Sequence, residues 1–328
     1  MIIATLRVIV CLFFIQSASA QVPITPKPLT PSSIRNVLVP PFNSMGNPAC
    51  DADGDMYFHV GRSFNDTEIL RLSADGNEGK LFKLSDQFPD AGKFRLSDFS
   101  VAPSGTVYVL GGVSVKQKSM LLRFDEGGKP SEPIPLRIPA DVIGDSIMAT
   151  DNRMVLLFGY HDDNAPPDLK GKSYLALLDT SGAVRQELHI SVPGADIAKL
   201  ASGEASSPGV ALGDDGNFYL AGSNQILVIS QGGELVGRIP FDNPYPKSTP
   251  ARLQVSGGVI VVTLARIDGH DAYDSYLVLL NPSGGVVGYY EPSKEQGNWV
   301  NMCYSPKQGL TFLKVENEQV KLLTAPFR

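Results

Sequence analysis

Two segments of the sequence place a histidine next to carboxylates, the residue types that bind metal ions and transfer protons. The two groups are His161-Asp162-Asp163 and Asp268-His270-Asp271. An imidazole and a carboxylate together can hold a divalent ion or act as base and acid. The alternative is that both segments are solvated polar loops, and the residue types alone leave this open.

Other segments that resemble reactive motifs are incomplete. Residues 51–55 resemble the start of a calcium-binding loop, but Met56 stands where that loop needs glycine and Arg62 where it needs glutamate. We therefore expect a turn between two strands there. The chain contains no G-x-S-x-G, H-E-x-x-H or C-x-x-C motif and no glycine loop of the phosphate-binding type. His59 and His189 fall within strand patterns, which favours packing or surface roles.

Strands must position these side chains, because strand patterns fill the chain and helix patterns are scarce. Turn pairs such as Asp53-Gly54, Ser104-Gly105 and Asp215-Gly216 are each followed by a β-rich run, and a second glycine-rich turn comes roughly twenty residues later. The unit repeats about every 50 residues with four strands, which is typical of a propeller blade. The sequence predicts an all-β, six-bladed β-propeller of four-stranded antiparallel blades, as one domain over residues 34–328.

The ring is expected to close through its N-terminal segment. The predicted blades cover 47–84, 94–138, 145–192, 207–241, 249–292 and 299 onward. The sixth lacks a fourth strand at its C-terminal end, whereas residues 34–42 (IRNVLVPPF) resemble the fourth-strand segment at 234–241 (ELVGRIPF). We expect residues 34–42 to complete blade six, with a loose N-terminal arm as the alternative.

Loop lengths differ between the two faces of the predicted ring. The tight Gly/Asp turns would all share one face, the tight-turn face. The long connections at 61–68, 159–173, 193–208 and 265–275 would share the other, the long-loop face. Elaborated loops on a rigid scaffold commonly carry function, so we expect the ligand or partner to bind the long-loop face. Both histidine–carboxylate groups belong to it.

The starts of the predicted innermost strands carry short oxygen-bearing side chains. Asp98 and Asp145 match in register, Asn47 has the same offset, Asn301 needs one insertion, and Ser207 needs two. Trp299 lies just before Asn301. We expect a partial ring of oxygens around the channel mouth on the long-loop face. The alternative is that these side chains only hydrogen-bond nearby loop amides.

The strand starts DADGDMYF, APSGTVYV and GDDGNFYL resemble those of NHL-repeat and gluconolactonase-like (TolB-like) six-bladed propellers, over nearly the whole mature chain. Gluconolactonase-like members hold a divalent ion with carboxylate and amide oxygens at comparable positions. The resemblance therefore implies a site for Ca²⁺ or another divalent cation, with Asp98 and Asp145 as its core pair. The early Glu-Gly-Pro metal-binding motif of that family is absent here, which counts against catalysis.

Cys50 and Cys303 fall on the predicted innermost strands of blades one and six, which become neighbours when the ring closes. In an exported chain, two cysteines in this arrangement are candidates for a disulfide. Two separate buried thiols are the alternative.

The first twenty residues predict a cleavable secretory signal peptide. Arg7 is followed by the apolar run VIVCLFFI and then by SASA, with cleavage expected near Ala20. A membrane anchor is the alternative. Residues 21–33 then form an extended proline-rich lead-in. We expect the mature chain to be secreted or periplasmic, monomeric and without a membrane span.

The charge pattern and the missing motifs together favour binding over catalysis. The formal net charge is −6 with no basic cluster, which argues against nucleic-acid binding. We expect an extracytoplasmic binding or scaffold module that engages a protein, peptide or glycan. The alternative is a metal-dependent hydrolase or lyase of the gluconolactonase-like type at the channel mouth.

Overall fold

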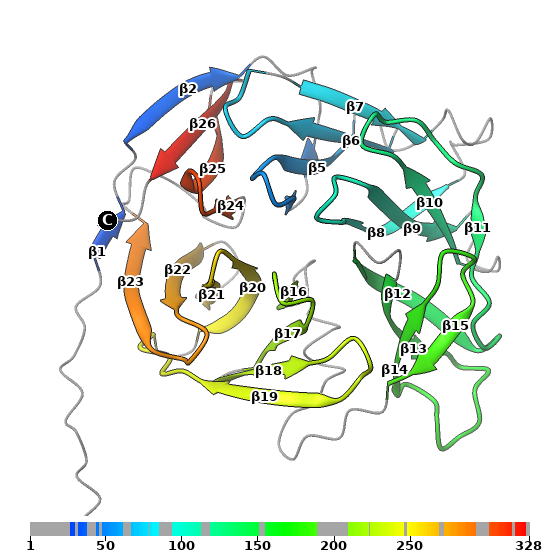
Figure 1. Cartoon of the computed structure of the whole chain (residues 1–328). Coiled ribbons are helices and arrows are strands. Elements are labelled where there is room, and N and C mark those ends of the chain that lie inside the picture. Colours follow the sequence, from blue (N-terminus) through cyan, green and yellow to red (C-terminus); the bar gives the residue numbers. More distant parts are fainter. Residues whose placement is uncertain are drawn as a thin grey trace, which may run out of the picture.

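The computed structural model is a ring of six blades around a central channel (Figure 1). The residues that the structure describes are 27–29, 32–37, 44–45, 48–61, 67–77, 79–84, 94–112, 119–150, 155–188, 209–222, 224–245, 248–268, 272–292, 302–316 and 319–325. The predicted all-β, six-bladed propeller is confirmed. No helix among these residues is long and apolar enough to cross a membrane.

The first three blades run from innermost to outermost strand in chain order. Blade one contains β4 (Ala49–Cys50), β5 (Met56–Gly61), β6 (Thr67–Leu72) and β7 (Gly79–Lys83), with β3 (Ser44–Met45) also paired to β5. Blade two contains β8 (Arg95–Val101), β9 (Val107–Gly112), β10 (Met120–Phe124) and β11 (Ile134–Pro135). Blade three contains β12 (Val142–Ala149), β13 (Val155–His161), β14 (Ser173–Leu178) and β15 (Val184–Glu187).

The last three blades include the two N-terminal strands. Blade four contains β16 (Val210–Leu212), β17 (Phe218–Ala221), β18 (Gln225–Ile229) and β19 (Leu235–Pro240). Blade five contains β20 (Thr249–Ser256), β21 (Val259–Asp268), β22 (Ala272–Leu280) and β23 (Val286–Pro292), with β1 (Lys27–Leu29) outside them. Blade six contains β24 (Met302–Ser305), β25 (Gly309–Glu316), β26 (Gln319–Ala325) and β2 (Ser33–Val37).

The N-terminal segment closes the ring, as the sequence predicts. β2 pairs antiparallel with β26, from Ser33 opposite Thr324 to Val37 opposite Val320. One feature of the lead-in was not predicted: β1 pairs in parallel with β23 and adds a fifth strand to blade five. Of its three residue pairs, two contain a proline, Pro28 and Pro292, which cannot donate to a ladder.

The tight turns explain the repeated sequence motif. In blades two to five, the first residue of the turn between the third and fourth strands uses its side-chain oxygen to accept amide N–H groups of the same turn. Examples are Asp179, which accepts from Ser181 N at 2.8 Å, and Asn281, which accepts from Ser283 N at 3.0 Å. Gly182 in one such turn has φ 74°, and a Cβ there would collide with the carbonyl oxygen of Pro135 in the preceding blade.

Each hydrophobic cluster of the core belongs to two neighbouring blades. Tyr57 of β5 packs with Val109 and Phe124 of blade two, whereas Met56 and Phe58 on the other face of β5 pack with blade six. Successive side chains of a strand point to opposite faces of its sheet. Both faces of the second strand of a blade, such as β5 or β9, are therefore buried, which is why its sequence is a nearly continuous apolar run.

Removing the N-terminal strands one at a time tests the closure of the ring. Deletion of residues 1–31 removes β1 and should lower the free energy of unfolding by less than about 1 kcal/mol, because β1 pairs through only three residues. Deletion of residues 1–37 also removes β2 and leaves the edge of β26 unpaired. We expect this second variant to lose several kcal/mol and its cooperative transition.

Circular dichroism melts and gel filtration of both deletion variants measure the difference. Equal melting behaviour of the two would contradict a closing role for β2.

Candidate functional site

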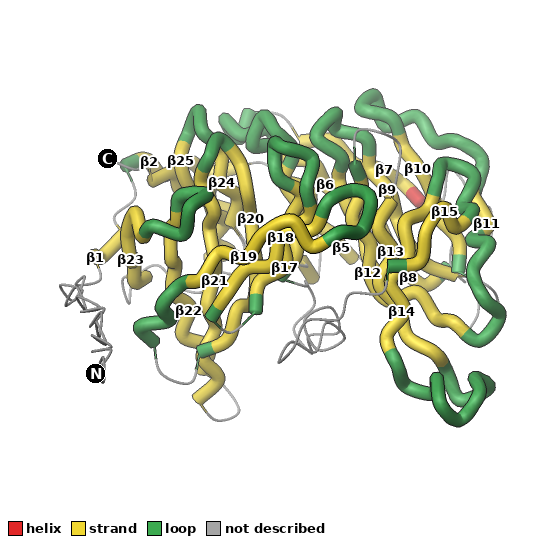
Figure 2. Tube along the Cα trace, turned by 60° about the horizontal axis from the view of Figure 1, so that its bottom comes forward, coloured by secondary structure: helices red, strands yellow, loops and turns green. Residues whose placement is uncertain are grey.

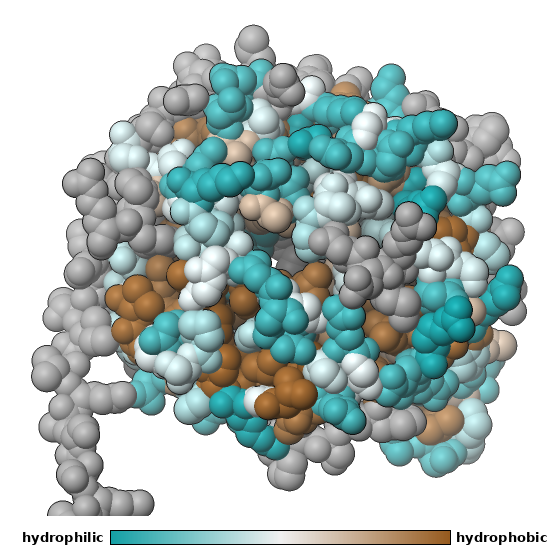
Figure 3. Space-filling view, in the orientation of Figure 1, coloured by the Kyte–Doolittle hydropathy of each residue, from teal (hydrophilic) through white to brown (hydrophobic). Residues whose placement is uncertain are grey.

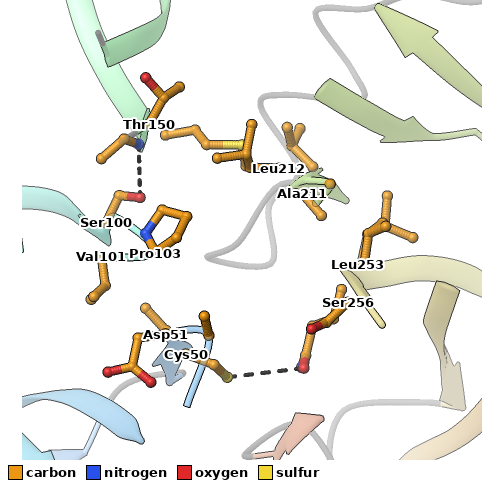
Figure 4. Close-up of a pocket in the computed structure, with 18 of the residues that line it drawn as sticks. Cys50, Asp51, Ser100, Val101, Pro103, Thr150, Ala211, Leu212, Leu253 and Ser256 are labelled. Atoms are coloured by element: carbon orange, nitrogen blue, oxygen red, sulfur yellow. Dashed lines mark hydrogen bonds between the residues drawn. The ribbon is translucent and has the colours of Figure 1, made fainter. Parts of the chain in front are cut away.

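A cavity of about 470 Å³ occupies the central channel. Figure 4 shows side chains from the innermost strands converging on it. It extends to residues of the first turns of the blades, including Asp51, Pro103 and Asp214, and so reaches the tight-turn face. Figure 3, in the orientation of Figure 1, shows the hollow at the centre of the ring. The other lining residues with polar side chains include Asp98, Ser100, Thr150, Gln231, Arg252, Gln254, Ser256 and Tyr304.

Two side chains of β8 in this wall bind the backbone of the next blade. Asp98 Oδ2 accepts a hydrogen bond from Ile147 N at 2.9 Å, and Ser100 Oγ accepts one from Ala149 N at 3.0 Å. Ile147 and Ala149 lie on β12, whose inner edge has no strand neighbour of its own in the sheet. The side chains of β8 therefore satisfy backbone donors that the sheet leaves unpaired.

The electrostatic state of Asp98 reflects this position in the wall. Burial raises the pKa of Asp98 to about 7, and the nearby Asp145 carboxyl adds to the rise, while the amides of Ile147 and Phe99 lower it. Burial also raises the pKa of Asp145. A carboxyl group with a pKa near neutrality can act as an acid or a base.

The predicted register of Asp98 and Asp145 is wrong by one residue. Asp98 lies opposite Leu110, directly after a β-bulge between Leu96 and Asp98. In β12 the bulge falls between Gly144 and Ser146, so Asp145 is itself the bulged residue and Ser146 takes the place of Asp98. Both strands carry their bulge at the same place, so the error comes from the turn residues on which the segments were aligned. Val101 pairs with Val107 and Ala149 with Val155, which puts Asp98 level with Ser146.

Blade five reaches the opposite part of the channel wall through Arg252 and Gln254 of β20. Arg252 is only 6% exposed, and its Nη2 donates to the carbonyl oxygen of Pro48 and lies 3.4 Å from Cys50 Sγ. Burial lowers the pKa of Arg252 to about 9. Gln254 accepts from Tyr304 N at 2.6 Å and donates to Met302 O at 3.0 Å. Gln254 thus pairs with the backbone of β24 in blade six.

The predicted disulfide is confirmed. Cys50 of β4 and Cys303 of β24 are bridged, with their Cα atoms 5.8 Å apart. The bond joins the first and last innermost strands of the ring.

The acidic segment at 51–55 forms the turn between β4 and β5, as expected. Asp51 Oδ1 accepts from the amides of Asp53 and Asp55, each at 3.0 Å, and Asp51 Oδ2 accepts from the Tyr57 hydroxyl at 3.1 Å. Asp55 holds Arg71 through Oδ2 at 2.6 Å and accepts from Ala74 N through Oδ1 at 2.8 Å. The oxygens of both carboxylates are occupied by groups of blade one itself.

His161 stands at the base of a loop, residues 162–172, that projects on the side of the ring opposite to the tight turns (Figure 2). Its Nδ1 lies 2.8 Å from Asp141 Oδ2, and this contact holds the pKa of Asp141 below its ordinary value. Its ring meets that of Tyr174 edge to face at 5.8 Å. The neighbouring acids serve the loop: Asp162 accepts from Asn164 N at 2.7 Å, and Asp163 pairs with Lys170 at 2.8 Å.

Several predicted site residues lie outside the described part of the chain or have side chains outside it. These are Asn47, Ser207, Trp299, Asn301, His270, Asp271 and the side chain of Asp268. Within the described residues, no group of three His, Cys, Asp or Glu side chains is placed to hold a metal ion.

Sequence reasoning missed the residues that act between distant segments. Arg252 and Gln254 contact strands about 50 or 200 positions away, and no motif marks them. Asp141, the partner of His161, lies 20 positions before it. Pairing β12 with β13 would have placed Asp141 near His161, because Val142, the residue after Asp141, lies opposite His161.

Comparisons with known proteins agree on the architecture. No family model and no curated protein matches the chain. Among solved structures, the putative TolB of Agrobacterium tumefaciens matches with a TM-score of 0.52 and 17% identity over 90% of this chain and 97% of that one. Regucalcin of A. tumefaciens, a calcium-binding protein, matches with a TM-score of 0.51 and 13% identity over 93% of this chain and 97% of that one. A putative gluconolactonase matches with a TM-score of 0.51 and 14% identity over 92% of this chain and 95% of that one.

The chain has the six-bladed propeller fold of these proteins. At such identities the likeness concerns the fold, and one fold hosts many functions.

Replacing Asp98 by asparagine tests its role in the wall. Asparagine keeps an acceptor for Ile147 N but cannot ionise. The pKa of Asp98 is about 7 in the folded state and near 3.8 when unperturbed, so the folded state binds the proton more tightly. The stabilisation that protonated Asp98 gives the folded state is therefore fully present below about pH 4 and is lost as the pH rises toward 7. We expect the stability of Asp98→Asn relative to wild type to increase from pH 5 to pH 8.

Urea unfolding at pH 5, 6, 7 and 8 measures this difference. Asp163→Asn, at an exposed carboxylate, is the matched control and should show no such rise. A difference that stays constant across this range for Asp98→Asn would refute the assignment.

Proposed function

We propose that the protein is a non-catalytic binding propeller that acts outside the cytoplasm and engages a protein, peptide or glycan through its long-loop face. The observation that carries the proposal is the braced loop 162–172 beside an exposed apolar pair. The disulfide supports an extracytoplasmic location, because disulfides persist in oxidising compartments. The signal-peptide pattern of residues 1–20 points the same way.

The loop is held in one conformation by its own contacts. Beyond the pairs at His161 and Asp163, Gly171 N donates to His161 O at 2.9 Å and Leu169 N donates to Pro166 O at 2.8 Å. Pro166 and Pro167 add backbone rigidity. A loop that is already ordered loses little conformational entropy when it binds, which favours affinity.

An exposed apolar pair lies next to this loop. Ile143 and Tyr160 are opposite each other on β12 and β13, and they are 36% and 41% exposed. Aromatic side chains with an apolar ring and a polar tip are common anchors at binding surfaces. On the tight-turn face, by contrast, the oxygens of the turn residues accept hydrogen bonds from their own turns.

Truncation of Tyr160 tests the binding surface. A phage-displayed peptide library and a glycan array are the probes, applied to the immobilised protein. We expect ligands selected on the wild type to bind Tyr160→Ala at least about tenfold more weakly, because loss of a central aromatic anchor costs more than 1 kcal/mol.

Val236→Ala is the matched control, since Val236 is an exposed apolar residue (54%) on the outer strand β19. Its ligand affinity should equal that of the wild type. Selection of no ligand, or ligands insensitive to Tyr160→Ala, would count against the proposal.

A metal-dependent hydrolase or lyase is the second candidate, and the raised pKa of Asp98 in the channel wall favours it. Ca²⁺ takes six to eight oxygen ligands. The described lining of the cavity contains three carboxylates, Asp51, Asp98 and Asp214, and Asp145 lies near Asp98. Each of the three lining carboxylates already accepts from at least one backbone amide. This donor set does not fit a calcium site, and we derive no catalytic step through a metal.

Thermal unfolding with Ca²⁺ and with chelator decides between the two candidates. Ligands that bind only the folded state raise its melting temperature. The binding-module proposal expects equal midpoints in both conditions for the wild type and for the double variant Asp98→Ala, Asp145→Ala. A calcium-dependent rise in the wild type that is absent in the double variant would favour the hydrolase.

A further inference from the structure

The two sulfurs of the Cys50–Cys303 disulfide have different surroundings. Cys303 is 1% exposed and packs among Met56, Phe58 and Leu322 at the seam between blades six and one. Cys50 is only partly buried and lines the central cavity (Figure 4). The bond is therefore open to small molecules from one side, at the sulfur of Cys50.

A buried cation lies beside that accessible sulfur. Arg252 Nη2 is 3.4 Å from Cys50 Sγ, and the carbonyl of Pro48 accepts a hydrogen bond from the same nitrogen. A neighbouring guanidinium favours the thiolate over the thiol. The nearest carboxylate in sequence, Asp51, is turned to its own turn, where it accepts from two amides and from Tyr57. Arg252 thus brings a cationic group to 3.4 Å from Cys50 Sγ.

We propose that Cys50–Cys303 is a redox-exchange site for a small dithiol that enters the central cavity. A thiolate of the dithiol attacks Cys50 Sγ, the disulfide breaks, and Cys303 leaves with the bonding electron pair and takes up a proton. The second thiol of the dithiol then attacks the dithiol sulfur bound to Cys50. Cys50 leaves as a thiolate beside Arg252 and the dithiol becomes a cyclic disulfide. The protein gains two electrons and one proton, and the second proton of the dithiol goes to the solvent.

The ring can remain folded while this bond is open. The seam between blades six and one keeps its apolar cluster, and β2 stays paired with β26 through five residue pairs. A purely structural disulfide needs neither an opening to a cavity nor a cation at one sulfur. The inference is independent of the long-loop face, which lies at the other end of the channel.

Reduction of the native protein is the first test. Wild-type protein is treated with dithiothreitol at pH 7 without denaturant, then with iodoacetamide, and the alkylated cysteines are identified by mass spectrometry over time. We expect reduction with the circular dichroism spectrum retained, and alkylation of Cys50 roughly tenfold faster than that of Cys303. Resistance to reduction until denaturant is added, or equal alkylation rates, would overturn the proposal.

Removing the cation is the second test. In reduced Arg252→Met, alkylation of Cys50 should slow by roughly tenfold, whereas Arg252→Lys should keep most of the wild-type rate. Arg185→Met is the matched control for loss of one positive charge, since Arg185 is exposed and pairs with Asp179 on the surface. An unchanged Cys50 rate in folded Arg252→Met would refute the role of Arg252. If that variant does not fold, the wild-type rates of the two cysteines still decide the matter.

Discussion

No blade of this propeller has a hydrophobic core of its own, and the rest of the structure depends on that constraint. A twisted sheet of four short strands has two apolar faces, and each face is buried only by the sheet of the next blade. One apolar cluster lies between each two neighbouring blades, and the cluster between blades six and one contains Met56 and Leu322. An open ring would expose two such faces, so folding depends on closure of the ring by β2.

The same geometry decides what the polar residues of the channel do. The innermost strand of each blade has one edge without a strand partner, and its amides still need acceptors. Asp98, Ser100 and Gln254 supply partners from the neighbouring blade. Asp98, which looks like a ligand for an ion in a linear alignment, thus has one carboxylate oxygen occupied by a backbone donor. The blades are also joined at the outside of the ring, where Arg137 N donates to Gly182 O at 2.8 Å.

The sequence predicted what depends on local pattern. Apolar runs, turn residues and the 50-residue period gave six blades, because a strand buried on both faces and a glycine turn are recognisable from neighbouring residues alone. The similarity of residues 34–42 to an outer strand placed the closing strand, and the closed ring then placed Cys50 beside Cys303. What failed depended on features without a local signal. The alignment on turn residues placed Asp145 one position away from the residue equivalent to Asp98, and the pairing of β1 with β23 was not foreseen. Arg252 was missed because its contacts cross blade six.

The two ends of the channel consequently differ in what they offer a ligand. On the tight-turn face, short connections keep the blades in register, and their side-chain oxygens are used within the turns. Length is tolerated on the other face, where a connection such as loop 162–172 can project because it carries no part of the seam between blades. The only cost of such a loop is its own conformational entropy, and the contacts of Asp141, Asp163 and Lys170 offset it. A rigid ring with a well-ordered loop at one end presents a preorganised surface. Between the two ends, the channel contains the polar side chains of its wall and the Cys50–Cys303 disulfide, which joins the innermost strands of blades one and six.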